Sequence, residues 1–77
     1  MKEKSLNDLL QGETAIIKKL YNKGTMRRRL IDLGFAPQSV VGCAFCAPLG
    51  DPKAFIIKNT IIALREEDSS LIKVSIL

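Results

Sequence analysis

Histidine and tryptophan are absent from this 77-residue sequence, and cysteine occurs only twice, as Cys43 and Cys46. A structural zinc site takes about four ligands, mostly from Cys and His, so one chain cannot close such a site without unusual ligands. The sequence also has no activated nucleophile pattern and no phosphate-binding loop, which are the usual marks of catalysis. We therefore predict no catalytic residue, no metal site within one chain and no cofactor.

Long apolar runs and aromatic residues are scarce as well. No run approaches the roughly 20 residues that a membrane-spanning helix needs, and the N-terminal stretch has an early acid instead of the apolar segment of a signal peptide. We therefore expect a cytoplasmic protein, in which two cysteines would stay reduced. With aromatic residues at 5%, few side chains are left to stack on bases, so no nucleic-acid partner is expected.

The remaining composition is that of one small globular domain spanning residues 1–77. Apolar residues make up 47% and charged residues 26%, which is too apolar for a disordered chain. The formal net charge is +4. This mild basic bias is compatible with a nucleic acid, an anionic membrane surface or an acidic protein as partner, or with a surface that is simply solvated.

Periodicity predicts a mainly β fold with one short α-helix. The stretch GTMRRRLIDLGF places Met26, Leu30 and Leu33 on one stripe of a helix that Thr25 caps. Gly34 follows, where a left-handed residue usually ends a helix. The other expected elements are a helical turn at 5–11, strands at 14–21, 39–47, 53–57, 60–65 and 70–76, and a two-residue hairpin turn at Lys58-Asn59. Five short strands in so short a chain indicate a strongly bent sheet or barrel.

Cys43 and Cys46 stand three residues apart in a stretch that reads as a strand. Side chains at positions i and i+3 of a strand point to opposite faces. We therefore predict that Cys43 lies in the core, that Cys46 faces the other way and that the two form no disulfide. A metal shared by the cysteine pairs of two chains stays open as an alternative. The complete predicted core is Ile17, Leu30, Leu33, Val41, Cys43, Ile62, Leu64, Ile72 and Val74.

The stretch APLGDP, residues 47–52, is predicted to be a tight connection between two strands. Its two prolines fix φ, and Gly50-Asp51 is turn chemistry in which the Asp side chain can accept a hydrogen bond from a nearby backbone N–H.

An apolar surface beside this turn follows from strand alternation. If Phe45 points inward with Val41 and Cys43, then Ala44 and Cys46 point outward, with Leu49 at the turn. Exposed apolar patches often mark contacts. Arg27–Arg29, at the start of the helix, would flank this surface and steer an acidic partner. The alternative is that the N-terminal turn, Leu6–Leu10, covers the patch.

Four stretches of the chain together resemble the FeoA family, small proteins of bacterial ferrous iron uptake. They are RRRLIDLGF at 27–35, APLGDP at 47–52, IIALREED at 61–68 and LIKV at 71–74, in this order and spacing. The chain departs from the family at Pro37-Gln38, where Pro-Gly is frequent and where Gln disfavours positive φ, and at Asn59, where Gly is common.

The resemblance implies an SH3-like β-barrel and an accessory or regulatory role alongside the membrane transporter FeoB. The chain would then associate with the inner face of the membrane through the transporter, and a second copy of the chain is a further partner to consider. A nucleic-acid-binding or regulatory module is the alternative, because a similar domain ends some metal-dependent repressors of the DtxR type. No metal-ligand set transfers from the family. The candidate partner-binding residues are Arg27, Arg28, Arg29, Cys46, Leu49 and Asp51.

Overall fold

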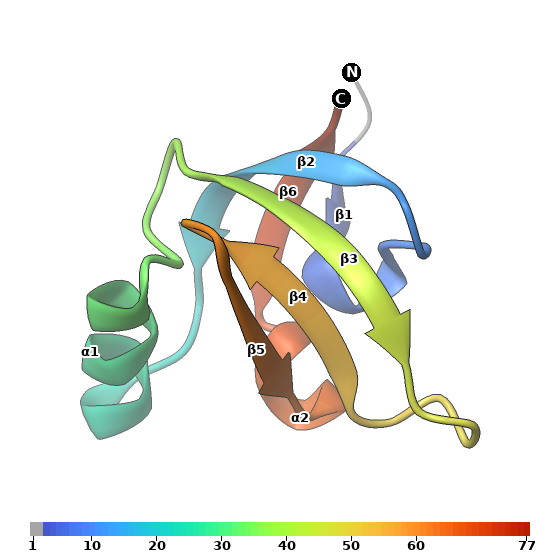
Figure 1. The fold of residues 1–77 in the computed structure, drawn as a ribbon. Helices are drawn as coiled ribbons and strands as arrows, with labels where there is room; N and C mark the ends of the chain where they lie inside the picture. The colour runs from blue at the N-terminus through green and yellow to red at the C-terminus, as the bar shows by residue number, and fades with distance from the viewer. Residues whose placement is uncertain (1–2) are drawn as a thin grey trace.

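The chain folds into one strongly bent antiparallel sheet. The computed structural model describes residues 3–77, and its six strands follow the order β1-β6-β2-β3-β4-β5. The sheet bends round its core, with helix α1 standing at one side (Figure 1). The predicted mainly β barrel with one short α-helix is confirmed. The elements are β1 (Glu3–Ser5), the 3-10 helix η1 (Leu6–Asp8), β2 (Thr14–Leu20), α1 (Gly24–Leu33), β3 (Val40–Cys46), β4 (Lys53–Ile57), β5 (Thr60–Leu64), α2 (Glu66–Ser69) and β6 (Ile72–Ile76).

The sequence analysis missed β1 and α2. Ser5 ends β1, where it pairs with Lys73, so the helical turn expected at 5–11 shrinks to η1. The single turn of α2 opens with the acidic run 66–68, and negative side chains stabilise the N-terminal turn of a helix. The acidic run 66–68 therefore begins a helix as well as lying on the surface.

Two turns show backbone that non-glycine residues rarely adopt. The β4–β5 hairpin closes through Lys58 (φ 48°) and Asn59 (φ 63°), which are the positive values of the predicted type I′ turn. Gln38 also has positive φ, at 76°, although Gln disfavours it. Its backbone N–H donates to the carbonyl oxygen of Ile17 (2.8 Å), so the turn keeps the conformation that a glycine would adopt freely.

Helix α1 ends as predicted but does not begin as predicted. Lys23 is the N-cap residue, and Thr25 lies exposed in the first turn, so the Thr25 cap was wrong. At the other end Gly34 is left-handed, with φ 112° and ψ −1°. The Phe35 N–H reaches back to the carbonyl oxygen of Leu30 (2.9 Å), a bond that the left-handed cap makes possible.

The core contains every predicted member except Leu33 and Ile62. Leu33 is 40% exposed, because α1 ends at this residue and the chain turns at Gly34, so that Phe35 takes the buried position. Ile62 is only partly buried against the core. The buried core residues that the sequence analysis did not place there are Leu6, Leu9, Ala15, Leu20, Phe35, Phe55 and Ile57.

Lys53 ties the N-terminal turn to the sheet. Its Nζ donates to the carbonyl oxygens of Asn7 (2.5 Å) and Leu9 (3.0 Å). The Ser69 hydroxyl, from α2, donates to the Asn7 side-chain oxygen (3.0 Å). Because Leu6 and Leu9 are themselves fully buried, η1 is part of the core and is not available to cover an outer surface.

Truncation of the two helix leucines should separate the core from the helix surface. We expect Leu30→Ala to lower the free energy of unfolding by about 2–5 kcal/mol, because a fully buried side chain leaves a cavity. We expect Leu33→Ala to cost less than about 1.5 kcal/mol, because its side chain is only partly removed from water. Urea denaturation measures both changes. Equal losses for the two variants would contradict this description of α1.

The left-handed cap gives a second test. A Cβ at Gly34 would lie 3.2 Å from Ile57 Cγ1 and 3.2 Å from Lys58 Cδ, in addition to the conformational cost of about 1–2 kcal/mol for a left-handed L-residue. Gly24 also has positive φ but has no atom within 4 Å of that position. Thermal unfolding should therefore show a larger loss for Gly34→Ala than for the control Gly24→Ala, and the reverse order would refute the close approach.

Candidate docking surface

Strands β3, β4 and β5 carry no charged side chain on the side that faces away from the core. The strand registers run Gly42–Ile56–Ile61 across the three strands, and nearer the loop they run Phe45–Ala54–Ala63. Phe45 is 53% exposed, Ile56 42% and Ile61 60%. We call this surface the outer face, and its residues are Val40, Gly42, Phe45, Ala54, Ile56, Ile61 and Ala63.

An apolar outer face is unusual for a small sheet with one side in water. Such strands normally alternate apolar residues inward with polar residues outward. Here Phe55 and Ile57 fill the inner side of β4, and Ile56 between them faces water. An exposed apolar surface spread over three strands is typical of a contact site.

A bulge in β3 decides which residues join this surface. The register with β4 shifts between Cys43, which pairs with Phe55, and Phe45, which pairs with Ala54. Ala44 is the extra residue, and it reverses the alternation of the strand. The prediction that Phe45 points inward with Val41 and Cys43 was therefore wrong: Phe45 belongs to the outer face.

The same bulge changes the account of the two cysteines. Cys43 pairs with Phe55 and Cys46 with Lys53, so both side chains belong to the inner side of β3, and the prediction of opposite faces was wrong. Cys43 is buried and Cys46, at the strand end, is exposed. Both thiols are free in the described chain, and the absence of a disulfide between them stays a prediction.

The environment of Cys43 makes its thiol unreactive. Burial raises the pKa of the Cys43 thiol above its ordinary value, and the nearby Lys53 ammonium offsets part of this rise. Because the thiolate is the reactive form, Cys43 behaves as a small apolar core residue. Its predicted place in the core is confirmed.

The loop of residues 47–52 follows β3 directly and carries the most exposed large apolar side chain of the described residues. Leu49 is 96% exposed. The loop is closed by hydrogen bonds from the Gly50 N–H to the Ala47 carbonyl oxygen (2.7 Å) and from the Ala47 N–H to the Pro52 carbonyl oxygen (3.0 Å). The alternative that the N-terminal turn covers this patch is therefore wrong for Leu49.

Asp51 is bound within the chain. Its Oδ1 accepts a hydrogen bond from the Glu66 backbone N–H (2.8 Å), at the first residue of α2. Its Oδ2 lies 3.9 Å from Arg65 Nη1. The predicted backbone cap exists, but the N–H comes from a distant element and not from the loop itself. Asp51 thus fastens the loop to α2 through the Glu66 N–H, with the Arg65 guanidinium nearby.

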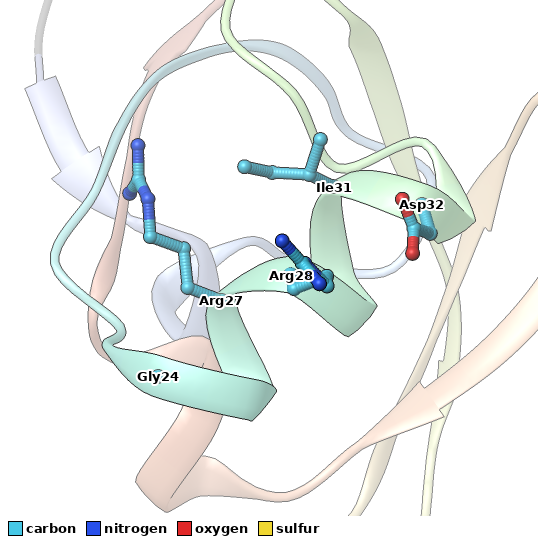
Figure 2. A pocket seen from close by; sticks show the side chains of 5 residues that line it. All are labelled: Gly24, Arg27, Arg28, Ile31 and Asp32. Atoms are coloured by element: carbon cyan, nitrogen blue, oxygen red, sulfur yellow. The ribbon is translucent and has the colours of Figure 1, made fainter.

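The three helix arginines lie on different sides of α1, and only Arg29 lies near a residue of the outer face, Ala63. Helix α1 stands at the left of the molecule and the loop after β3 projects at the lower right (Figure 1). Arg27 Nη1 donates to the Leu20 carbonyl oxygen (2.8 Å). Figure 2 shows Arg27 and Arg28 beside a shallow hollow on one side of α1, while Arg29 lies on the side that faces β5. Arg27 and Arg28 therefore do not flank the loop, and a role of Arg27, Arg28 and Arg29 in binding stays a prediction.

Within residues 3–77 the structure contains no group of three or more His, Cys, Asp or Glu side chains placed to hold a metal ion. The described helices are also too short to cross a membrane.

Comparison with known proteins identifies the family. The family model described as the FeoA domain matches residues 4–76. A curated relative, the Fe(2+) transport protein A/Fe(2+) transporter FeoB fusion protein of Porphyromonas gingivalis, is 32% identical over 72 residues, which are 94% of this chain and 8% of the relative. The chain thus corresponds to a small part of that fusion protein.

Solved structures agree with this family. The solution structure of iron(II) transport protein A from Clostridium thermocellum has a TM-score of 0.90 and 36% identity, covering 95% of this chain and 45% of that chain. FeoA of Stenotrophomonas maltophilia, a procaryotic SH3 domain protein solved with zinc, has a TM-score of 0.77 and 25% identity, covering 92% and 88%. The predicted SH3-like fold is confirmed, and the chain belongs to the FeoA domain family.

Proposed function

We propose that this chain is a non-enzymatic accessory protein of ferrous iron uptake that docks on a FeoB-type transporter through the outer face and Leu49. The observation that carries the proposal is the uncharged outer face, together with the exposed Leu49 in the loop that follows β3. The P. gingivalis relative supports the choice of partner, because its name joins Fe(2+) transport protein A and FeoB in one chain. Docking would hold this chain at the cytoplasmic side of the membrane.

Leu49 and Phe45 would anchor the contact. Full burial of a leucine or phenylalanine side chain contributes about 1.5–3 kcal/mol, and about 1.4 kcal/mol changes an affinity tenfold. Interfaces concentrate their energy in a few such side chains, while the surrounding contacts exclude water. Ile56 and Ile61 form that surround, since both are partly exposed and lie directly opposite each other.

The loop is prepared for binding before the partner arrives. Two backbone hydrogen bonds close it, and Asp51 fastens it to α2. A loop that is already ordered loses less conformational freedom on association. Asp51 is therefore proposed to act by positioning Leu49, not by touching the partner. The Arg29 side chain, on the side of α1 that faces β5, would raise the encounter rate with an acidic partner from a distance, an effect that falls with salt.

Replacement of the loop leucine tests the anchor. We expect Leu49→Glu to stay folded, because the side chain is almost fully exposed, and to weaken binding to the same organism's FeoB in lipid nanodiscs at least about tenfold. The matched control is Leu77→Glu, which places the same charge on a 61% exposed leucine at the opposite end of the molecule. Biolayer interferometry measures both affinities, and ferrous iron uptake in cells measures the consequence. Wild-type binding and uptake by a folded Leu49→Glu protein would rule out the anchor.

Asp51 separates positioning from direct contact. Loss of a carboxylate that accepts from a helix N-terminus costs about 0.5–2 kcal/mol, so Asp51→Ala should speed hydrogen exchange in the loop and α2 and weaken docking severalfold. Asp32→Ala, on the exposed side of α1, is the control. If Asp51→Ala weakens docking while exchange in the loop is unchanged, Asp51 touches the partner directly.

A further inference from the structure

Strand β5 is one edge of the sheet, and half of its backbone groups have no partner strand. The type I′ turn makes Ile57 and Thr60 a hydrogen-bonded pair. Hydrogen-bonded and non-bonded pairs then alternate along the hairpin. The N–H and C=O groups of Ile61 and Ala63 therefore point away from β4, toward the open side of β5.

This edge lacks the features that usually prevent strand pairing. Natural edge strands carry charged residues, prolines or bulges, or they are very short. Strand β5 has the sequence TIIAL, with neither charge nor proline, and its register with β4 is continuous over five residue pairs. The opposite edge, β1, has three residues in the described part of the chain.

A groove runs along this edge, between β5 and α1. Met26 and Leu33 line it from the helix and Ile62 lines it from the strand. Leu33, which the sequence placed in the core, is exposed here because nothing in the described chain fills the groove above it. Arg29 and Arg65 border the groove, and Asp68 is the acidic residue among its lining residues, so the border has a net positive charge.

We propose that this groove binds an extended segment of a partner protein, added to β5 as a further strand, with apolar side chains at alternate positions and acidic residues beside them. Backbone groups of Ile61 and Ala63 would supply the pairing, which is the usual mode of strand addition at a free sheet edge. Alternate side chains of the added strand would enter the groove against Leu33 and Ile62, and the acidic ones would face Arg29 and Arg65.

A second copy of this chain does not fit the groove. The β5 strand of a second copy holds its inward side chain Leu64 in its own core, and its Ile62 packs against that core. Its inward side chains are therefore not free to enter the groove between β5 and α1, and its free side chains, Ile61 and Ala63, lie on the outer face. The partner segment belongs to the transporter, and in this respect the inference rests on the proposed function.

Ala63→Pro is a selective test of strand addition. Proline removes a backbone N–H that points to the open edge and leaves the bonds to β4 in place, which edge strands tolerate. Ala63→Thr keeps the N–H and is the control. A second variant and its control leave β5 unchanged. Arg29→Glu changes the charge at the groove, whereas Arg28→Glu makes the same change on the other side of α1.

The binding of these variants is measured with FeoB in nanodiscs and with an eight-residue peptide that alternates valine with glutamate. A peptide that alternates valine with lysine is the control. We expect Ala63→Pro and Arg29→Glu to weaken binding of FeoB and of the acidic peptide at least about tenfold. Ala63→Thr and Arg28→Glu should bind as the wild type does, and the lysine peptide should not bind. If the acidic peptide binds as expected but FeoB does not bind, the groove is a strand-binding site and the transporter is not its partner.

The inference is overturned if both groove variants bind FeoB like the wild type, or if the wild type fails to prefer the acidic peptide. If Ala63→Pro does not fold, Arg29→Glu and Arg28→Glu decide alone. Sedimentation of the free protein gives a further check. A dimer that Ala63→Pro dissociates would show that the edge pairs with a second copy, and would also overturn the proposal.

Discussion

A barrel has only one inside, and strands β3, β4 and β5 carry apolar residues on both of their sides. Phe55 and Ile57 are buried, so Ile56 must face water, and the same holds for Ile61 on the neighbouring strand. Core burial supplies the stability of so small a domain, and it cannot accommodate both sides. Burial in the core therefore does not account for the apolar outer face, and the proposed contact with a partner would account for it.

Different structural features form the two proposed contact surfaces. The bulge at Ala44 turns Phe45 outward, and Asp51 fastens the following loop to α2, so one end of the outer face is rigid and strongly apolar. Strand β5 contributes Ile61 to the same face and its free edge to the groove beside α1. The two proposed contacts thus meet on one strand. Of the α1 arginines, Arg29 borders the groove, and Arg27 and Arg28 lie on the other side of the helix.

Sequence reasoning located most strands, the type I′ turn and the left-handed Gly34, because each depends on local chemistry that neighbouring residues show. It failed where distant elements decide. The side of the sheet on which Phe45 lies depends on the bulge in β3, which the pairing with β4 sets. The burial of Phe35 in place of Leu33 depends on how α1 packs against the barrel. Asp51 was recognised as a cap, but its partner lies 15 residues away in α2. The apolar character of both strand sides was visible in the sequence, and it led to Leu49.

The most direct test is amide hydrogen exchange of this protein alone and in complex with FeoB in nanodiscs. The account predicts slower exchange on binding in residues 45–52 and in β5, where the backbone amides of Ile61 and Ala63 point to the open edge of the sheet. It predicts no change in β1 and β6, which lie away from β5 in the sheet order. Protection confined to β1 and β6, with residues 45–64 exchanging as before, would contradict it.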